Sequence, residues 1–400
     1  MPGPLDGIRI LDLSAVLSGP LATMMLADQG AEVIKVEPPG LGDIMRIGLN
    51  RRAGMAAFFA NANRGKRSIV LDLGREKGRD VVRELARRAD VFVQNFRPGA
   101  MERLGLGEAE LRLRNPDLIY VSISGYGDSG PYSSRRVYDP IIQALSGHVA
   151  VQQNPEVPIR DLVRNVVADK ASAYTAAQAI TAALFARERG AGGQHLRIPM
   201  LDASLAFFWP DGMMRHTLLG DGIHGGPTLY ELYRLWDTAD GHLVYFTASD
   251  AEFQGLFRAL GHPEWCEDER FATSAKRSRP ENFAALGALL LEAIRGWKTR
   301  ELLERMVAEG VPAGPVLSLD EIFDDPQIAH NRAIFEAEHP VYGRYRQARP
   351  AARFDRTPQA PGRMPPLHGE HTDEILAELG YDDAARAALR AEGVVPGDGP

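Results

Sequence analysis

Residues 8–37 have the sequence IRILDLSAVLSGPLATMMLADQGAEVIKVE, and this stretch decides the fold class. Residues 8–13 form an apolar run typical of a buried strand, and residues 31–37 form a second one. Between them, apolar side chains recur at helical spacing from Ser18, a candidate helix N-cap, to Gly30, a typical helix stop. A strand, a helix and a second strand in this order predict a parallel βαβ unit.

The alternation of strand and helix continues through the first half of the chain. The predicted strands are nearly continuous in apolar residues, which is typical of parallel strands covered by helices on both faces. The sequence therefore predicts an α/β fold with a doubly wound, Rossmann-like parallel sheet. Further strands are predicted at residues 68–73, 90–96, 118–127 and 194–200, and long helices at 139–151 and 163–189.

The sequence changes character after a glycine-rich break at residues 220–227, which is a candidate linker. Residues 228–246 predict two or three antiparallel strands with a turn at Asp240–Gly241, and helical patterns follow. We therefore expect a smaller α+β domain over residues 228–320. A second linker is expected at 320–366, because its later part is rich in Pro, Arg and Gly and suits an extended connection across the first domain or a partner.

Composition excludes several classes of protein. The 400-residue chain has 46 Lys and Arg against 53 Asp and Glu, a formal charge of −7, which argues against holding nucleic acid or an anionic membrane by bulk charge. The single cysteine, Cys266, excludes an internal disulfide framework and a cysteine-based zinc site. The first residues lack a signal-peptide pattern, and no stretch approaches the ~18 apolar residues that span a bilayer. We expect a cytoplasmic protein with no nucleic-acid or membrane partner.

The motifs of common cofactor enzymes are absent. The segment after the first strand lacks G-x-G-x-x-G, and the chain has no Walker A sequence, no H-E-x-x-H and no G-x-S-x-G. The ten histidines lack ligand spacing, so no metal is expected. A standard NAD or ATP enzyme is therefore disfavoured.

Basic residues instead lie beside the ends of the predicted strands, where open α/β sheets bind ligands. Arginine offers two parallel donors to a phosphate, so these clusters indicate a site for a multiply phosphorylated small molecule. The alternative is that they are ordinary solvated loop charges. The clusters comprise Lys66 and Arg67, then Arg97 and Arg103, then Arg135 and Arg136.

Several motifs in fixed order closely resemble the class III coenzyme A transferases, which include formyl-CoA transferase and the carnitine-pathway CoA-transferase. The resemblance covers nearly the whole chain. It rests on LDGIRILDLSAVLSGPLATMMLADQGAEVIKVEPP (5–39), NRGKRSIVLDL (63–73), VFVQNFRPG (91–99), LIYVSISGYGDSGPY (118–132), YDPIIQALSG (138–147), ARERGAGGQHLRIPMLDA (186–203) and HGEHTDEILAELGY (368–381).

The resemblance implies both an architecture and an activity. The large Rossmann-like domain would be built from both chain ends, residues 1–220 and 330–400, with the small domain of residues 228–320 inserted between them. Two subunits would thread through one another as an interlocked homodimer. The implied activity is that of an acyl-CoA:carboxylate CoA-transferase, with no cofactor beyond coenzyme A as substrate.

The family's nucleophile is an aspartate in the segment that matches residues 166–174 (VVADKASAY), and Asp169 occupies its place. Without the resemblance, an aspartate early in a helix is equally explained as a residue that complements the helix dipole. A carboxylate suits the chemistry, because its attack on a thioester gives a mixed anhydride and then an aspartyl–CoA thioester without hydrolysis. We therefore predict that Asp169 is catalytic.

The resemblance also assigns a CoA site and a shielding loop. Gly225 and Gly226 are the counterparts of the family's glycine-rich loop, although that loop is shortened here and paired glycines before a proline also make a simple turn. Val16 and Leu17 would line the site, Leu71 would lie against the adenine, and Tyr138 and Asp139 would close the wall. Asn95, Phe96, Arg97 and Arg103 would hold the nucleotide, and Arg136 would meet phosphate.

Departures from the family pattern bear on the acid substrate. Formyl-CoA transferases carry Gln at the position of Leu17 and Arg at the position of Pro38, so oxalate is in doubt and a larger or less polar acid is favoured. Arg46, Arg51 or Arg52 is available for a distal carboxylate, unless solvent alone meets it. The donor acid, the acceptor acid and the pathway are not specified by the sequence.

Two alternatives to a transferase are a racemase that shares the fold and, from another class, a non-catalytic CoA-binding or assembly protein. A 2-methylacyl-CoA racemase of this group places His immediately before the aspartate that aligns with Asp139. This chain has Tyr138 there, and a phenol with a reference pKa of about 10 replaces imidazole poorly at neutral pH. A non-catalytic CoA-binding protein would not need Asp169. The ranking is transferase, racemase, then binding protein.

Overall fold

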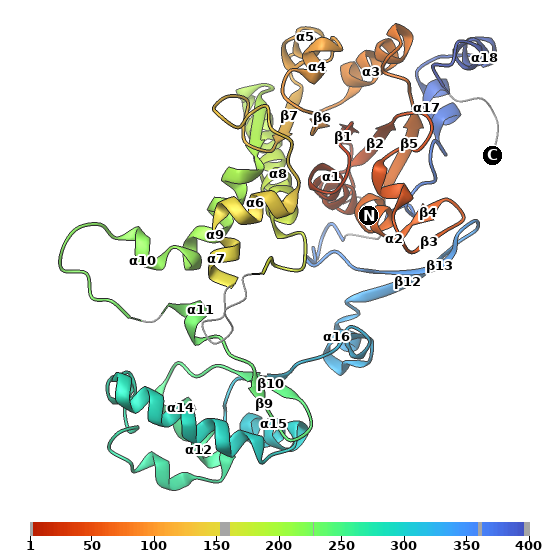
Figure 1. The fold of residues 1–400 in the computed structure, drawn as a ribbon. Helices are drawn as coiled ribbons and strands as arrows, with labels where there is room; N and C mark the ends of the chain where they lie inside the picture. The colour runs from red at the N-terminus through yellow and green to blue at the C-terminus, as the bar shows by residue number, and fades with distance from the viewer. Residues whose placement is uncertain (1–2, 153–160, 227, 359–361, 396–400) are drawn as a thin grey trace. The chain divides into compact units, whose positions relative to one another are not determined.

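The computed structural model describes residues 3–152, 161–226, 228–358 and 362–395. The chain forms two compact units (Figure 1). The first contains the described residues of Met1–Met214 and Arg332–Pro400, and the second is Arg215–Asn331. The linkers expected at 220–227 and 320–366 include residues 227 and 359–361, which lie outside the described residues.

Unit 1 is built on a sheet of six parallel strands, in the order β5-β2-β1-β6-β7-β8. The chain runs outward from β1 through β2 to β5 and then crosses to the other side of β1, so the order reverses between β1 and β6. This is the doubly wound Rossmann-like order, and it confirms the predicted fold class. The strands are β1 (Arg9–Asp12), β2 (Glu32–Glu37), β5 (Lys66–Val70), β6 (Val91–Gln94), β7 (Ile119–Ser124) and β8 (His195–Pro199).

Alternate residues of each strand enter two different cores, because successive side chains point to opposite faces. Ile10 and Val91 pack in the cluster that includes helices α1 (Ser18–Asp28) and α8 (Val167–Ala186). Leu11 and Phe92 pack in the cluster that includes α3 (Glu76–Arg88), α17 (Thr372–Glu378) and α18 (Asp383–Ala391). Both faces of the sheet are therefore covered by helices, as the apolar strands predict.

The C-terminal helices pack beside the first strands of the chain (Figure 1). Arg67 on β5 pairs with Glu374 at 2.8 Å and with Glu378 at 2.7 Å, both on α17. The segment before these helices contains a hairpin of β12 (Ile334–His339) and β13 (Gly343–Ala348), where a plain extended connection was expected. Glu336 pairs across it with Arg344 and Arg346, which explains how so polar a sequence forms strands.

Two helices differ from their predicted bounds. The helix expected over 139–151 is divided into α6 (Asp139–Ser146) and α7 (His148–Gln152) by Gly147, whose φ is +97°. The helix expected from 163 begins at Val167, because Gln143 on α6 holds the preceding segment. Its side-chain amide donates to the carbonyls of Val163 and Asn165 and accepts from the Val163 amide.

The remaining elements of unit 1 connect the sheet. Arg52 at the β3–β4 hairpin donates to the Arg344 carbonyl, and Gln347 on β13 donates to the Ala60 carbonyl, so the C-terminal hairpin lies against this region. The connecting elements are β3 (Arg51–Arg52), β4 (Met55–Ala56), α2 (Ala57–Asn63), α4 (Ala100–Arg103), α5 (Glu108–Arg114) and α9 (Met200–Gly212), and α10 (Met214–Thr217) follows at the boundary of the units.

Unit 2 has a three-stranded antiparallel sheet and several helices around its own apolar core. Residues 228–232, expected in a strand, form α11 instead, because Thr228 and Glu231 make a capping box. The third strand, β11, comes from about seventy residues later in the chain. The elements are α11 (Leu229–Leu232), β9 (Trp236–Asp237), β10 (His242–Tyr245), α12 (Asp250–Leu260), α13 (Ser274–Arg277), α14 (Pro280–Arg295), α15 (Thr299–Ala308), β11 (Ala313–Pro315) and α16 (Pro326–Asn331).

No helix in the described parts of the chain combines the length and the apolar character that crossing a membrane requires.

Candidate active site

The loops that follow β1 and β6 meet at the point where the strand order reverses. Asn95, directly after β6, accepts the Ala15 amide through Oδ1 at 2.9 Å and donates to the Ala15 carbonyl through Nδ2 at 2.7 Å. Both polar atoms of Asn95 are thus used to hold the β1 loop. A crevice at this position is where open α/β sheets bind their ligands.

The β1 loop has an unusual backbone conformation. Val16 has a φ of +71°, a left-handed conformation that is rare for a β-branched residue. Its amide donates to Asp43 Oδ1 at 3.2 Å. Helix α1 then begins at Ser18, with Leu17 in the N-cap position and no side-chain cap, so the expectation that Ser18 is the N-cap was wrong.

Asp169 lies in the first turn of α8 and is 8% exposed. The backbone amide of Ser18, at the start of α1, favours the ionised form of this carboxyl and lowers its pKa. The amino ends of α1 and α8 therefore both present partial positive charge to this carboxylate.

Asp139, in the first turn of α6, holds the backbone at Asp169 by hydrogen bonds. One of its oxygens accepts the Ala168 amide at 2.8 Å and the Asp169 amide at 3.0 Å, and the other accepts from Gln143 Nε2 at 2.5 Å. Asp139 is 3% exposed, so its carboxylate is buried and these hydrogen bonds satisfy both of its oxygens. Asp139 therefore accepts from backbone amides at the start of α8 that have no partner within the helix, although it lies thirty residues away in sequence.

Burial raises the pKa of the Asp169 carboxyl to about 7, with a further upward contribution from the charge of Asp139. The Ser18 amide acts in the opposite direction, because it stabilises the ionised form. A carboxylate of this pKa is a stronger base, and hence a stronger nucleophile, than an exposed one. A strongly perturbed carboxyl in a ligand-binding crevice indicates a functional residue.

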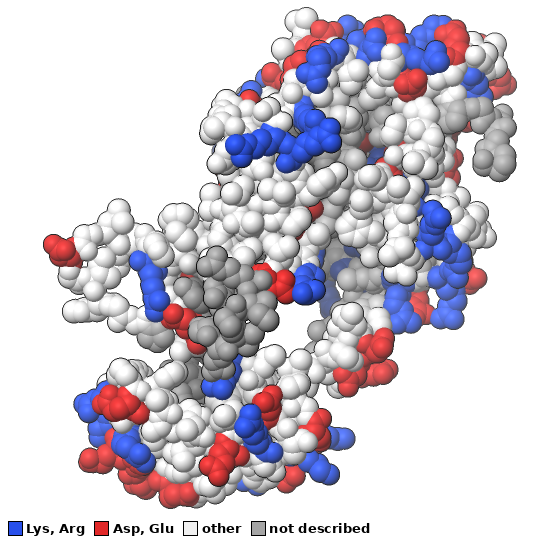
Figure 2. All heavy atoms as spheres, in the orientation of Figure 1, with Lys and Arg blue, Asp and Glu red and all other residues white. Residues whose placement is uncertain are grey.

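Three predicted phosphate contacts, Arg97, Arg103 and Arg136, lie on loops or short helices after β6 and β7 and are exposed. Among the residues that the structure describes, none of the three guanidinium groups forms a hydrogen bond or ion pair. Figure 2 shows a group of basic side chains over β6 and β7. Charged donors without carboxylate partners are suited to an anionic ligand.

The other predicted site residues are placed less uniformly. Phe96 is 39% exposed and Tyr138 is 65% exposed, so both rings can contact a ligand. Leu71 is fully buried in the core beside β5, so its side chain does not reach the surface in this structure. Gly225 and Gly226 are exposed residues of unit 2, and their shielding role stays a prediction.

Several basic residues considered from the sequence are already paired. Lys66 and Arg67 begin β5, so they lie at its amino end, and both are buried against carboxylates. Arg46 is 5% exposed and bonds to Glu37 through Nε and Nη2, each at 2.7 Å, so it is not free to receive a substrate carboxylate. Arg135 lies over the Tyr132 ring, at 3.8 Å from its centroid.

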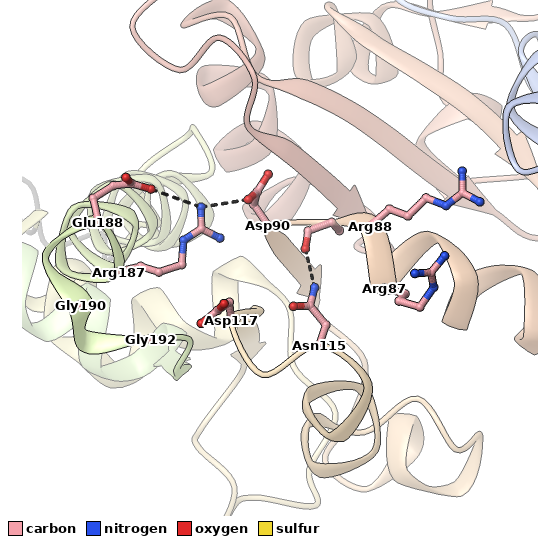
Figure 3. Close-up of a pocket in the computed structure, with 10 residues that line it drawn as sticks. Arg87, Arg88, Asp90, Asn115, Asp117, Arg187, Glu188, Gly190 and Gly192 are labelled. Atoms are coloured by element: carbon pink, nitrogen blue, oxygen red, sulfur yellow. Dashed lines mark hydrogen bonds and ion pairs between the residues drawn. The ribbon is translucent and has the colours of Figure 1, made fainter.

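A cavity of about 580 Å³ lies elsewhere, at the amino ends of β6 and β7 (Figure 3). Arg187 points to Asp90 at 2.9 Å, and the guanidinium of Arg88 is directed away from it. The charged lining residues balance, since Arg87, Arg88 and Arg187 stand against Asp90, Asp117 and Glu188. We call the sides of the sheet where the strands begin and end its amino edge and its carboxyl edge. The position of this cavity at the amino edge and its paired charges make it a weaker candidate than the crevice at the carboxyl edge.

Sequence reasoning did not identify the residues that shape the site, namely the Ser18 amide, Gln143, Lys35 and Asp43. The sequence does contain one signal for buried charges here. Asp12 and Lys35 each lie between apolar residues of a predicted strand, and buried charges in a strand require partners.

Comparison with known proteins gives a consistent result. The sequence model of CoA-transferase family III matches residues 5–372. The chain is 35% identical to succinyl-CoA:glutarate CoA-transferase of Homo sapiens, over 98% of this chain and 90% of the relative. It is 31% identical to formyl-CoA:oxalate CoA-transferase of Shigella sonnei, over 98% and 99%. A crystal structure of a CAIB/BAIF family protein from Brucella suis superposes with a TM-score of 0.81 at 33% identity, covering 95% of this chain and all of that one.

Proposed function

The chain belongs to CoA-transferase family III, and from this premise we propose how its residues move CoA from one carboxylic acid to another. The enzyme is a CoA-transferase, as its sequence predicts. The proposal concerns the nucleophile, the CoA contacts, the class of acid and the assembly. The observation that carries it is the buried Asp169 carboxylate, held between the amino ends of two helices at the crevice of the sheet.

Asp169 acts as the nucleophile. Its free carboxylate oxygen bonds to the acyl carbon of the donor thioester and the C–S bond breaks, which gives a mixed anhydride and CoA thiolate. The thiolate then bonds to the Asp169 carbonyl carbon, the bond between that carbon and the bridging oxygen of the anhydride breaks, and the donor acid leaves as a carboxylate that keeps this oxygen. The acceptor carboxylate repeats these steps in reverse and departs as the new thioester.

The surrounding groups adapt Asp169 to this task. The Ser18 amide favours the ionised form of Asp169, which is the form that attacks the thioester. Asp139 fixes the backbone at Ala168 and Asp169 and therefore fixes where the carboxylate lies. Burial limits water, which would hydrolyse the anhydride.

CoA binds over the carboxyl ends of β6 and β7 in this proposal. Arg97, Arg103 and Arg136 meet its phosphates, because they are exposed and have no protein partner among the described residues. The exposed ring of Phe96 offers a face for stacking the adenine. Asn95 contributes indirectly, because it holds the β1 loop against this surface. The proposal uses CoA as a substrate and includes no metal.

The acids are proposed to be dicarboxylates longer than oxalate. The relative with 35% identity is named for succinyl-CoA and glutarate, whereas a relative with 31% identity is named for oxalate. Leu17, at the end of the β1 loop, is buried and apolar, which is consistent with a longer acid than oxalate. Three arginines are candidates for binding the distal carboxylate. Arg51 is exposed and has no partner among the described residues, whereas Arg46 already pairs with Glu37.

The assembly is proposed to be an interlocked homodimer. Helices α6, α8 and α9 leave large apolar side chains exposed, which is unusual for a monomer in water and indicates an interface. Sedimentation at nanomolar concentration should show a dimer, and a folded monomer would contradict this part of the proposal. The exposed residues are Ile141 (46%), Leu145 (48%), Tyr174 (65%), Phe185 (64%), Phe207 (61%) and Trp209 (45%).

A panel of acids tests the proposed activity. The protein is incubated with succinyl-CoA and, separately, with oxalate, malonate, glutarate, adipate or butyrate, and the CoA esters are identified by mass spectrometry. We expect glutarate or adipate to accept CoA faster than oxalate, and Asp169→Asn to form no new ester. Preference for oxalate would contradict the proposed acid class, and transfer by Asp169→Asn would contradict the nucleophile.

A further inference from the structure

Six charged side chains are buried beneath the β1 loop. Three are acidic and three are basic, and none is more than 5% exposed. Burying ions costs more free energy than their pairing returns in many proteins, so such a cluster is weak evidence for a purely stabilising role. The six residues are Asp12, Lys35, Glu37, Asp43, Arg46 and Lys66.

Lys35 and Asp43 form hydrogen bonds with the backbone of the β1 loop at two points. Lys35 Nζ donates to the Ser14 carbonyl at 2.7 Å and lies 3.0 Å from Asp43 Oδ2. Asp43 Oδ1 accepts the Val16 amide at 3.2 Å and the Met45 amide at 3.0 Å. The pair therefore joins the carbonyl before Ala15 to the amide after it.

Asp12 and Lys66 anchor the ends of the same loop. Asp12 Oδ1 accepts the Ser14 amide at 2.9 Å, and its Oδ2 lies 2.9 Å from Lys66 Nζ. Lys66 Nζ also donates to the Pro20 carbonyl at 2.9 Å. The loop is thus fixed at Ser14 and Pro20, which leaves Val16 as the residue whose conformation the Lys35–Asp43 pair determines.

The conformation of Val16 matters for the site because Ser18 follows two residues later. A β-branched residue at φ +71° persists only when its surroundings determine it. Relaxation of Val16 to a negative φ would redirect the backbone that leads to the Ser18 amide, the group that favours the ionised form of the Asp169 carboxyl.

We propose that Lys35 and Asp43 are positioning residues, which hold Val16 in its left-handed conformation so that the Ser18 amide meets the Asp169 carboxylate. The inference rests on the proposed role of Asp169 as nucleophile. It adds a device that neither touches substrate nor lies in the crevice. The groups that face Asp169 are Asp139 from α6 and the Ser18 amide from α1, so loss of the amide leaves the repulsion from Asp139 unopposed.

Asp43→Asn tests the device, because the amide keeps the size of the side chain but removes the charge that pairs with Lys35. We expect kcat to fall by at least about tenfold, since misplacement of a reacting group by a fraction of an ångström has effects of this size. The acid limb of the kcat/KM profile should move to higher pH, because the ionised Asp169 has lost a donor. The Kd for CoA should change by a smaller factor than kcat, because the proposed arginine contacts lie on other loops and remain intact.

A glycine at position 16 provides the rescue. Glycine adopts a positive φ without steric cost, so Asp43→Asn with Val16→Gly should recover at least about threefold of the lost kcat. Proline at position 16 cannot adopt a positive φ and has no amide hydrogen. Val16→Pro should therefore lower kcat. Because Val16 is only half-buried, this variant tests the loop conformation without removing a buried charge.

Asp28→Asn is the matched control, because Asp28 is also a buried acid paired with a base, Arg64, at 2.7 Å. It should lower thermal stability and leave the acid limb unchanged. The inference is overturned if Asp43→Asn keeps the kcat per folded site and the wild-type acid limb, or if Val16→Pro keeps wild-type kcat. Transfer by Asp169→Asn would instead overturn the proposed nucleophile, so the two failures are distinguishable.

Discussion

The two edges of the parallel sheet carry charge in opposite ways. At the carboxyl edge, Arg97, Arg103 and Arg136 are exposed and have no partner within the described parts of the chain, and the Asp169 carboxyl is buried beside the charge of Asp139. At the amino edge, the cavity of about 580 Å³ is lined by arginines that carboxylates already neutralise, such as Arg187 against Asp90. The difference teaches that charge without a protein partner is a better guide than a cavity to the edge we propose as reactive.

The largest expected effect separates the nucleophile from acids of the amino edge. Asp169→Asn should reduce CoA transfer by at least about a thousandfold, because the amide has no oxygen able to form the anhydride. CoA affinity should persist, since the amide is nearly isosteric. Asp117→Asn, which changes a lining acid of the amino-edge cavity, should transfer CoA at the wild-type rate. Equal losses in the two variants, measured by initial rates, would abolish the distinction between the edges.

The fold was predictable where the signal is local. Apolar strands of four to six residues alternate with helices between Arg9 and Ser124, and this pattern specifies a parallel sheet. The sequence predicts a strand at residues 228–232, whereas the capping box of Thr228 and Glu231 begins helix α11 there. In the three-stranded sheet of unit 2, the remaining strand, β11, lies far along the chain. Local sequence patterns do not specify such distant pairing.

The candidate site was predictable only in part. The choice of Asp169 depended on family resemblance, since an isolated aspartate in a first helical turn is common. The support that Asp139 gives to α8 joins segments thirty residues apart, and Asp43 from another loop accepts the amide of the left-handed Val16. These contacts arise only once β1, β2 and β6 are aligned in the sheet, so no local pattern in the sequence indicates them.

The second expected effect is on stability and depends on pH. The pKa of Asp169 is raised to about 7 from its ordinary value of 3.8, so the folded state favours its protonated form. The associated stability is present below pH 4 and is lost as the pH rises to about 7. Asp169→Asn should therefore be more stable than wild type at pH 8, by up to about 4 kcal/mol, with a smaller difference at pH 4.

Chemical denaturation at the two pH values measures this difference. Glu84 near the amino edge gives the opposite sign, because Arg87 lowers the pKa of its carboxyl and its contribution is lost on acidification. A wild type that gains stability relative to Asp169→Asn on going from pH 4 to pH 8 would show that Asp169 is not buried as described.

A third, smaller effect concerns CoA binding. Arg103→Ala and Arg136→Ala should each weaken CoA binding by about 1–3 kcal/mol, the usual cost of losing a charge-assisted phosphate contact. Titration calorimetry with CoA measures the change, and dephospho-CoA indicates which phosphate each residue contacts. Unchanged affinity in both variants would remove the proposed phosphate contacts from the carboxyl edge.

The smallest expected effect distinguishes local contact from bulk charge. Arg87→Ala removes one positive charge, as Arg103→Ala does, but Arg87 lies at the amino edge and bonds to Glu84 at 2.7 Å. At an ionic strength of about 0.15 M, charges beyond a Debye length of about 8 Å are largely screened. The Kd for CoA should therefore stay within about twofold of wild type in Arg87→Ala, whereas Arg103→Ala should raise it about tenfold or more. Similar increases in both variants would mean that CoA responds to the overall charge of the protein, and the contrast between the two edges would then have no bearing on where it binds.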